Sequence, residues 1–347
     1  MATPNLRALV HGARHDRPLL ALAPMEGVSD AIVRALLSEL GGMDFCVTEF
    51  IRVQRLPVPP KVLRRDCPEL ASGGQTPSGV PVIVQLLGGS PGPMATSARL
   101  AAEMGAPGID LNFGCPAKTV NGSDGGAALL KCPSRLTDVV AATREAVPQD
   151  ISVSAKIRLG WDDPDEVVPL VLAAEAGGAD WITIHGRTKV QMYKPFADWN
   201  RIRNAVQAVK IPIIANGDIF DPDALARCAD VTGCTSFMLG RGAFRRPNLF
   251  RWLRNLDGSE WPLERCVQLL FRFVGEVRVS PRFRKPERTA LARLKMWCNA
   301  MRDAYPAMHP VFERIKRTQD VQDALQGLLD CGFSPAEPDV HRPTCTP

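Results

Sequence analysis

The stretch from Trp181 to Gly240 reads WITIHGRTKVQMYKPFADWNRIRNAVQAVKIPIIANGDIFDPDALARCADVTGCTSFMLG and contains the repeating unit that predicts the fold. Its apolar runs at 181–185, 211–215 and 236–240 are separated by segments with the residue spacing of amphipathic helices, at 199–209 and 222–228. Short, unbroken apolar runs are typical of parallel strands that are covered on both faces. The stretch therefore predicts strand–helix units of a parallel sheet.

The same alternation extends outward on both sides. Towards the N-terminus there are five more apolar runs, at 19–24, 44–48, 80–86, 108–112 and 151–156. Eight such units predict an α/β fold of the (β/α)8 or TIM barrel type, whose usual length is about 250 residues. A doubly wound sheet would carry a glycine-rich turn after its first strand, whereas Ala23-Pro-Met-Glu26 follows here without a GxGxxG motif.

A change of pattern after residue 256 predicts a second, smaller, all-helical domain. Strand-like runs stop there, and helical patterns follow at 261–279, 285–305, 309–318 and 321–331. The proline-rich end contains few large apolar residues, which is typical of a mobile terminus. We therefore expect an N-terminal extension at 1–18, the barrel at 19–256, the helical domain at 257–332 and a flexible tail at 333–347.

Charge is unevenly distributed along the chain. The net charge is +5, but residues 241–317 contain 18 Lys and Arg against 7 Asp and Glu. Such a basic segment is typical of a protein with a polyanionic partner such as nucleic acid. An ordinary solvated, arginine-rich surface would explain the composition equally, so both interpretations remain open at this point.

The cysteines and the N-terminus indicate the compartment. None of the ten cysteines forms a CxxC pair, so neither a zinc site nor a disulfide framework is predicted, and free thiols are typical of a reducing cytosol. Residues 1–18 lack the apolar core of a secretory signal. No apolar window of about 18 residues occurs either. We expect a cytoplasmic protein that does not associate with membranes.

Functional side chains in a barrel follow the C-terminal ends of the strands. Gln85 there can bond an edge of a flavin or a pyrimidine, or simply nearby backbone. Lys156 can form a Schiff base or stabilise the negative N1–O2 edge of a reduced flavin. His185 can bind a ligand or satisfy a backbone carbonyl. Cys115 lies between Gly114 and Pro116, which aim its thiol at the barrel mouth. A thiol with an ordinary pKa near 8.5 is protonated at pH 7 and can act as an acid.

The loops after the seventh and eighth strands predict a phosphate site. Asn216-Gly217-Asp218 and Gly240-Arg241 each place a glycine just past an apolar strand, where backbone N–H groups can approach a ligand closely. Barrels frequently bind phosphate between these two loops, and Arg241 would add a charged donor.

Six motifs, in order along residues 19–329, together resemble the tRNA-dihydrouridine synthases. They are Ala23-Pro-Met-Glu26, Asn112-Phe-Gly-Cys-Pro-Ala-Lys-Thr-Val-Asn-Gly122, Ala155-Lys-Ile-Arg158, His185-Gly-Arg-Thr188, Ala215-Asn-Gly-Asp218 and Gly240-Arg-Gly242. The stretch from Cys115 to Ala127 is similar to the bacterial C-type subfamily, which implies uridine 16 of the tRNA D-loop as the target. The family is known as an FMN-containing barrel with a C-terminal helical domain that grips tRNA.

The resemblance implies a role for each site residue. Pro24, Met25 and Glu26 would line the flavin, and Gln85 and Lys156 would bond its ring edges. His185 would lie near the flavin, and the phosphate would be held by Asn216, Gly217, Asp218, Gly240 and Arg241. Cys115 would be the catalytic proton donor.

The resemblance also implies a reaction and a partner. NADPH reduces FMN, hydride passes from N5 of the flavin to C6 of uracil, and Cys115 protonates C5 from the opposite face. A uridine inside folded tRNA must be flipped out to reach the barrel mouth. Candidate tRNA contacts are Arg52, Asn112 and Tyr193 near the mouth, and Arg293, Lys295 and Lys316 in the helical domain. We expect a monomer.

Two rival interpretations carry different expectations. An FMN barrel that acts on a free dihydroorotate or dihydropyrimidine would not need the basic C-terminal segment. A non-catalytic RNA-binding module would not need Gln85, Cys115 and Lys156 together at the strand ends. The sequence therefore favours the tRNA-modifying enzyme.

Overall fold

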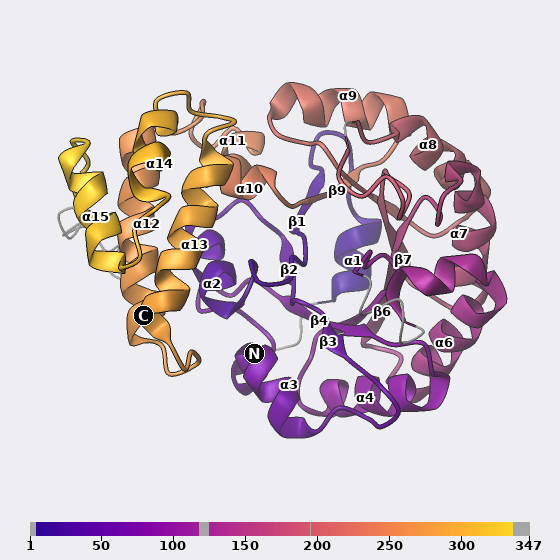
Figure 1. Ribbon diagram of the computed structural model, residues 1–347. Helices are drawn as coiled ribbons and strands as arrows, with labels where there is room; N and C mark the ends of the chain where they lie inside the picture. The colour runs from indigo at the N-terminus through magenta and orange to yellow at the C-terminus, as the bar shows by residue number, and fades with distance from the viewer. Residues whose placement is uncertain (1–4, 118–124, 195, 336–347) are drawn as a thin grey trace, which may run out of the picture. The chain divides into compact units, whose positions relative to one another are not determined.

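The computed structural model describes residues 5–117, 125–194 and 196–335. The chain divides into two compact units, the first comprising Met1–Gly242 with Phe250–Leu256 and the second comprising Ala243–Leu249 with Asp257–Pro347. Figure 1 shows the ribbon of both.

Eight parallel strands of the described chain close into the barrel of the first unit (Figure 1). They are β1 (Leu19–Leu22), β2 (Phe45–Val47), β4 (Val82–Leu87), β5 (Gly108–Asn112), β6 (Ser152–Arg158), β7 (Trp181–His185), β8 (Ile213–Asn216) and β9 (Ser236–Leu239). Pairing of β1 with β9 and of β2 with β4 completes the ring. The predicted TIM barrel is confirmed. A two-residue strand that we did not predict, β3 (Ile51–Arg52), pairs in parallel with Leu86 and Leu87 at the C-terminal end of β4.

Helices follow the strands and cover the outside of the barrel (Figure 1). Their starts follow from local chemistry, because the side chains of Asp30, Asp198 and Asp221 each accept a hydrogen bond from an N–H group of the first turn. The helices are α2 (Ala31–Leu40), α3 (Pro60–Asp66), α4 (Pro91–Glu103), α6 (Pro133–Ala146), α7 (Val167–Ala176), α8 (Trp199–Ala208), α9 (Pro222–Thr232) and α11 (Leu249–Leu253). The short helix α10 (Gly242–Arg245) follows β9 and belongs almost entirely to the second unit. Short 3-10 turns occur at Pro68–Ser72, Gly126–Lys131 and Pro164–Glu166.

The segment predicted as an N-terminal extension contains a helix, α1 (Leu6–His11), that packs into the barrel. Leu6 and Val10 are buried in one apolar cluster with Leu19, Trp181 and Met238. Leu19 and Trp181 are the first residues of their strands, so α1 covers the N-terminal end of the barrel, opposite the functional end. Residues 1–4 of this segment lie outside the described residues.

The second unit contains the helices α12 (Leu263–Val279), α13 (Pro286–Met301), α14 (Met308–Ile315) and α15 (Val321–Asp330). Its core is built around the fully buried Trp297, whose ring lies 4.9 Å from that of Phe244 and 5.0 Å from that of Phe273. The helical C-terminal region is therefore confirmed. Most of the predicted tail, residues 336–347, lies outside the described residues. Within the described ranges no helix is long and apolar enough to cross a bilayer.

Candidate active site

A cavity of about 590 Å³ opens at the C-terminal ends of the barrel strands. That volume is within the range of pockets that bind cofactors and substrates. The predicted site residues that line it come from six strands and their loops; they are Pro24, Met25, Glu26, Asn112, Cys115, Lys156, His185, Tyr193, Asn216, Gly217, Asp218, Gly240 and Arg241. The structure thus brings the motifs of distant sequence segments to one place.

Cys115 is held in this cavity by the side chain of Asn112. The Oδ1 atom of Asn112 accepts hydrogen bonds from the backbone N–H groups of Gly114 and Cys115, both at 3.0 Å. The Cys115 side chain is 8% exposed, and burial raises the pKa of its thiol. The thiol is therefore protonated at neutral pH, as a proton donor must be. Residues 118–124 of the same motif lie outside the described residues.

A buried hydrogen-bond relay extends from Asn112 into the barrel. Asn112 Nδ2 donates to Gln85 Oε1 at 2.8 Å, and Gln85 Nε2 donates to Asp110 Oδ2 at 2.7 Å. The second oxygen of Asp110 accepts from the Ser154 hydroxyl at 2.6 Å. An ionised Asp110 can only accept hydrogen bonds, and the N–H groups of Gly114 and Cys115 at the other end of the relay can only donate them. The side-chain amides of Gln85 and Asn112 between them therefore have one allowed orientation each. Gln85 is fully buried and does not line the cavity; the relay uses one N–H and one lone pair of its amide, which leaves one of each.

Lys156 and Asp110 are the charged pair within the barrel. Burial raises the pKa of Asp110 to about 6, despite the opposing hydrogen bonds from Ser154 and Gln85. Burial likewise lowers the pKa of Lys156 to about 8. Lys156 Nζ donates to Asn216 Oδ1 at 3.0 Å, and Asn216 Nδ2 in turn donates to the carbonyl of Met238 at 2.7 Å. Two neighbouring strands, β8 and β9, therefore fix the ammonium group in the cavity.

The Asp218 side chain organises the loops after β8 and β9. Its Oδ2 accepts from Arg187 Nη2 at 2.5 Å, and its Oδ1 accepts from Arg241 Nη2 at 3.1 Å. Gly217 has a φ of +125° and Asp218 a φ of +57°, so the chain makes a left-handed turn here. Since both carboxylate oxygens bind arginines, Asp218 contributes to the cavity through its backbone and through the placement of Arg241.

His185 carries an unsatisfied atom at the cavity wall. Its Nδ1 is buried without a hydrogen-bond partner, while its Nε2 lies 3.4 Å from Arg187 Nη1. Burial and the nearby cations Arg158, Lys156 and Arg187 lower the pKa of His185 well below 6.5. The ring is neutral, and its orphan nitrogen indicates a missing hydrogen-bond partner.

The residues of this cavity fit FMN. Lys156 is a cation that suits the anionic N1–O2 edge of a reduced flavin, and Nδ1 of His185 is free to bond a polar ligand atom. The two loop glycines are closely packed against their neighbours: a Cβ on Gly217 would lie 3.0 Å from the Ala197 methyl group, and one on Gly240 would lie 3.4 Å from Met25 Sδ. The backbone can therefore approach a phosphate closely.

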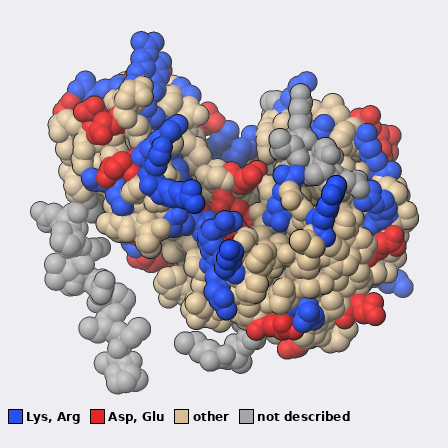
Figure 2. Space-filling model, turned by 60° about the horizontal axis from the view of Figure 1, so that its bottom comes forward, with Lys and Arg blue, Asp and Glu red and all other residues tan. Residues whose placement is uncertain are grey.

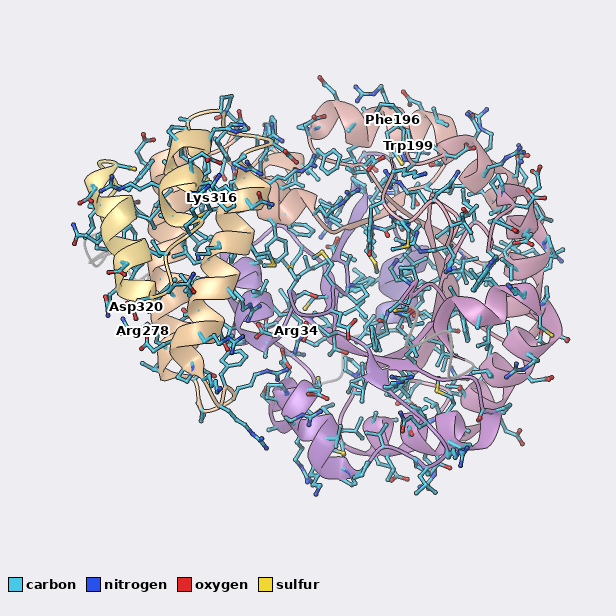
Figure 3. The ribbon with its side chains drawn as sticks, viewed as in Figure 1. Arg34, Phe196, Trp199, Arg278, Lys316 and Asp320 are labelled. Atoms are coloured by element: carbon cyan, nitrogen blue, oxygen red, sulfur yellow. The ribbon has the colours of Figure 1, made fainter. Side chains whose placement is uncertain are left out.

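Hydrogen bonds through Ser29 connect the loop of Pro24, Met25 and Glu26 to the side chain of Arg34, which Figure 3 labels. Arg34 is fully buried and binds both oxygens of Glu69 at 2.8 Å, while its Nη1 donates to the carbonyl of Ser29 at 2.9 Å. The Ser29 hydroxyl accepts from the Met25 N–H at 2.7 Å. The buried ion pair of Arg34 and Glu69 is thus connected to Met25 of the cavity wall through Ser29.

The three candidate tRNA contacts near the mouth have different surroundings. Arg52 lines a second cavity, of about 830 Å³, together with Arg55 and Gly88. Asn112 lines the main cavity but is 9% exposed and bonded as described above. Tyr193 is 53% exposed, with the guanidinium groups of Arg158 and Arg241 at 5.4 and 5.5 Å from its ring centre.

The three candidates in the helical unit are not equivalent either. Arg293 is 7% exposed and lies over the ring of Phe273 at 5.1 Å, so the structure places it in the interior rather than on an open surface. Lys295 Nζ donates to the carbonyl of Thr318 at 2.5 Å. Lys316, labelled in Figure 3, pairs with Glu313 on its own helix. On the face shown in Figure 2, Lys and Arg form several clusters with Asp and Glu between them.

Three residues of the site, Asp110, Arg158 and Arg187, had no role assigned to them from the sequence, although Arg158 and Arg187 belong to two of the quoted motifs. Arg158 Nε donates to the carbonyl of Gly114 at 2.8 Å and so supports the Cys115 loop. The period of two in a strand could have identified two of them, because Asp110 shares a face with Asn112, and Arg158 shares one with Lys156. No local signal pointed to the pairing of Arg187 with Asp218.

Comparison with known proteins gives the family. The model of the family described as dihydrouridine synthase (Dus) matches residues 21–329. The tRNA-dihydrouridine(16) synthase of Vibrio vulnificus (strain CMCP6) is 45% identical over 309 residues, which cover 88% of this chain and 95% of that protein. The protein of the same name from Escherichia coli (strain K12) is 42% identical over 315 residues, which cover 88% of this chain and 97% of that protein.

Two solved structures show the same fold at low sequence identity. Histamine dehydrogenase from Rhizobium sp. 4-9 matches with a TM-score of 0.54 and 13% identity, over 69% of this chain and 46% of that one. A 2-naphthoyl-CoA reductase matches with a TM-score of 0.52 and 13% identity, over 69% of this chain and 50% of that one. The extent of the family match and the identity to the two bacterial enzymes show that the chain belongs to the dihydrouridine synthase family of flavin-dependent tRNA oxidoreductases.

Proposed function

We propose that the chain reduces uridine 16 in the D-loop of tRNA to 5,6-dihydrouridine, with FMN as cofactor and NADPH as reductant. The target position follows from the names of the Vibrio and Escherichia relatives. The observation that carries the chemistry is the buried Cys115 thiol in the same cavity as Lys156, and the burial that raises the pKa of this thiol favours its protonated form. We assign cofactor and chemistry to the barrel, 19–256, and the tRNA grip to the helical segment, 257–332.

Three groups of residues would hold FMN. The backbone of Gly217, Asp218 and Gly240, with the Arg241 guanidinium, would bind its phosphate. Lys156 and the remaining polar atoms of Gln85 would bond the ring edges, and His185 Nδ1 would gain a partner. Pro24, Met25 and Glu26 would form the wall that Arg34 braces. When bound, FMN supplies the hydride for C6 of uracil, and NADPH restores its reduced form.

The chain's own task in the reaction is to deliver a proton. Cys115 donates its thiol proton to C5 as the C5–C6 double bond is lost, and the resulting thiolate regains a proton from solvent. Asn112 holds the backbone N–H groups of Gly114 and Cys115, which directly precede the Cα atom that carries the thiol, and Arg158 holds the carbonyl of Gly114. These contacts fix the direction from which the proton arrives.

Phosphate contacts would position the tRNA, because they fix register without reading sequence. Arg52, Tyr193, Lys295 and Lys316 keep side chains at or near the surface and remain our candidates. Arg293 would act from the interior, by shaping the helical surface above Phe273. We place the enzyme in the cytoplasm as a monomer, where its RNA substrate is available.

The test compares wild type with Cys115→Ala and Cys115→Ser. We expect dihydrouridine formation to fall by about 10²–10⁴, the usual cost of losing a general acid. Bound FMN and NADPH oxidation with oxygen should be retained, since neither requires the thiol. Mapping of the product in tRNA should give position 16. Near-normal yield from Cys115→Ala would overturn the role of the thiol, and turnover of free uridine or orotate would favour a small-molecule enzyme.

A further inference from the structure

The loop between β7 and α8, residues 186–197, exposes an aromatic side chain that the mechanism does not use. Phe196 is 86% exposed, whereas phenylalanine is among the residues most often fully buried in folded proteins. Val190, Met192 and Tyr193 of the same loop are also exposed. We call these four exposed side chains the loop patch; of the four, Phe196 and Val190 do not line the catalytic cavity.

The loop patch stays exposed because hydrogen bonds from neighbouring side chains hold the backbone of the loop in place. Arg158 Nη1 donates to the carbonyls of Thr188 at 3.1 Å and Met192 at 2.9 Å, and Arg187 Nε donates to the carbonyl of Lys194 at 2.5 Å. The N–H of Ala197, the residue after Phe196, donates to Asp218 Oδ2 at 2.7 Å.

Close packing secures the same end of the loop. A Cβ on Gly186 or Gly217 would lie 3.1 or 3.0 Å from the Ala197 methyl group, so Ala197 fits closely against both glycines. Trp199, just beyond, donates from Nε1 to the carbonyl of Gly217 at 3.1 Å. Phe196 therefore lies beside a fixed point of the site (Figure 3).

The loop patch adjoins the mouth of the catalytic cavity. Met192 and Tyr193 line that cavity, and the loop's anchors, Arg187 and Asp218, belong to the proposed phosphate site. Phe196 itself does not line the cavity, but it directly precedes Ala197, whose N–H is bonded to Asp218 of the cavity wall.

Charge indicates the chemistry of the partner. Residues 186–197 contain Arg187, Lys189 and Lys194 and no Asp or Glu. Aromatic side chains among cations are typical of surfaces that stack the unpaired bases of single-stranded RNA segments, whereas an apolar protein partner gains nothing from the cations.

We propose that Phe196 stacks on an unpaired base of the tRNA substrate next to the uridine that enters the cavity. The proposal rests on the proposed function for the identity of the RNA. It assigns the affinity of this loop to two parts: stacking by Phe196, and phosphate attraction by Lys194.

The test measures tRNA binding and steady-state kinetics for Phe196→Ala, Phe196→Leu and Phe196→Trp. We expect KM and Kd for tRNA to rise about 10-fold for Ala, the lower range of the loss of one stacked base. Leu, which is apolar but cannot stack, should resemble Ala, whereas Trp should match or exceed wild type. Leu172→Ala, which removes another exposed side chain from the same unit, is the matched control and should bind as wild type. NADPH oxidation should be unchanged in all variants.

Salt dependence separates stacking from charge. Phe196→Ala should leave the slope of log K against log salt unchanged, while Lys194→Ala should reduce it by about 0.7–0.9, as expected for one phosphate contact. A Phe196→Ala affinity equal to that of the Leu172→Ala control would overturn the proposal, as would a Leu variant that binds as well as wild type. Failure of wild type to form dihydrouridine would instead count against the proposed function, since tRNA binding is measured separately.

Discussion

Replacement of Asn112 by leucine removes the link between the buried relay and the catalytic loop while keeping the side chain's approximate volume. Two backbone N–H groups, those of Gly114 and Cys115, lose their acceptor, and Gln85 Oε1 loses its donor. An unpaired buried polar group costs about 1–3 kcal/mol. Two such amides therefore oppose the present loop conformation by about 2–6 kcal/mol, unless the loop moves to expose them to water.

Movement of the loop displaces the thiol, and a displacement of about 1 Å can cost about 100-fold in rate. The assay is single-turnover oxidation of the reduced enzyme by saturating tRNA, measured beside tRNA affinity. We expect the single-turnover rate of Asn112→Leu to fall about 100-fold, with a smaller change in Kd. FMN content serves as the folding control.

The companion variant Asn112→Asp tests the direction of the relay. It keeps an acceptor for the two amides but turns an oxygen towards Gln85 Oε1, and Gln85 cannot rotate without facing the Asp110 carboxylate with its own oxygen. We expect this variant to weaken FMN retention as well as rate. A loss of tRNA affinity with an unchanged single-turnover rate in Asn112→Leu would refute the positioning role and make Asn112 an RNA contact.

Three further predictions follow from buried groups. Lys156→Met should lower the reduction potential of bound FMN. The difference in potential between variant and wild type should narrow as the pH rises through about 8, because Lys156 loses its proton and its charge there. A difference that does not change with pH in potentiometric titrations would contradict this. Arg34→Leu should destabilise the fold by about 3–5 kcal/mol in denaturant titrations, since Glu69 is left buried and unpaired, and a second change, Glu69→Leu, should recover much of the loss. Because its pKa is raised, Cys115 should be alkylated more slowly at pH 7–9 than an ordinary thiol, as peptide mapping would show, and an ordinary rate would exclude a raised pKa.

The strands and most helices could be predicted because the barrel repeats one local pattern. Each parallel strand is an apolar run, and each helix after it has its own polar face, so neighbouring residues contain enough information. Strand β3 contains only Ile51 and Arg52, too few for a period to be recognised. The docking of α1 was also not predictable, because the cluster in which Leu6 and Val10 are buried draws its members from strands spread between Leu19 and Met238.

The site was predictable as a set of residues but not as a network. The rule that barrel function follows the strand ends selected Cys115 and Lys156 correctly as residues of the cavity. The rule does not say which side chain lines the cavity and which lies behind it. Gln85 is an example, because it is fully buried between Asp110 and Asn112 and does not line the cavity. The burial of Arg293 shows the same limit for charge counts, because its cationic group lies against Phe273 and not in solvent.

The position of α1 beneath the barrel affects the order in which the enzyme can assemble during synthesis. Leu6 and Val10 leave the ribosome first, but Trp181 and Met238 of their cluster are made last, and β1 also pairs with β9. At roughly 5–20 residues per second, α1 waits about 10–50 s for its binding surface. During that interval an amphipathic helix and an unpaired first strand are exposed together. The barrel closes at its first and last strands in one late event, so chaperones that bind the nascent N-terminus would act on this protein for most of its synthesis.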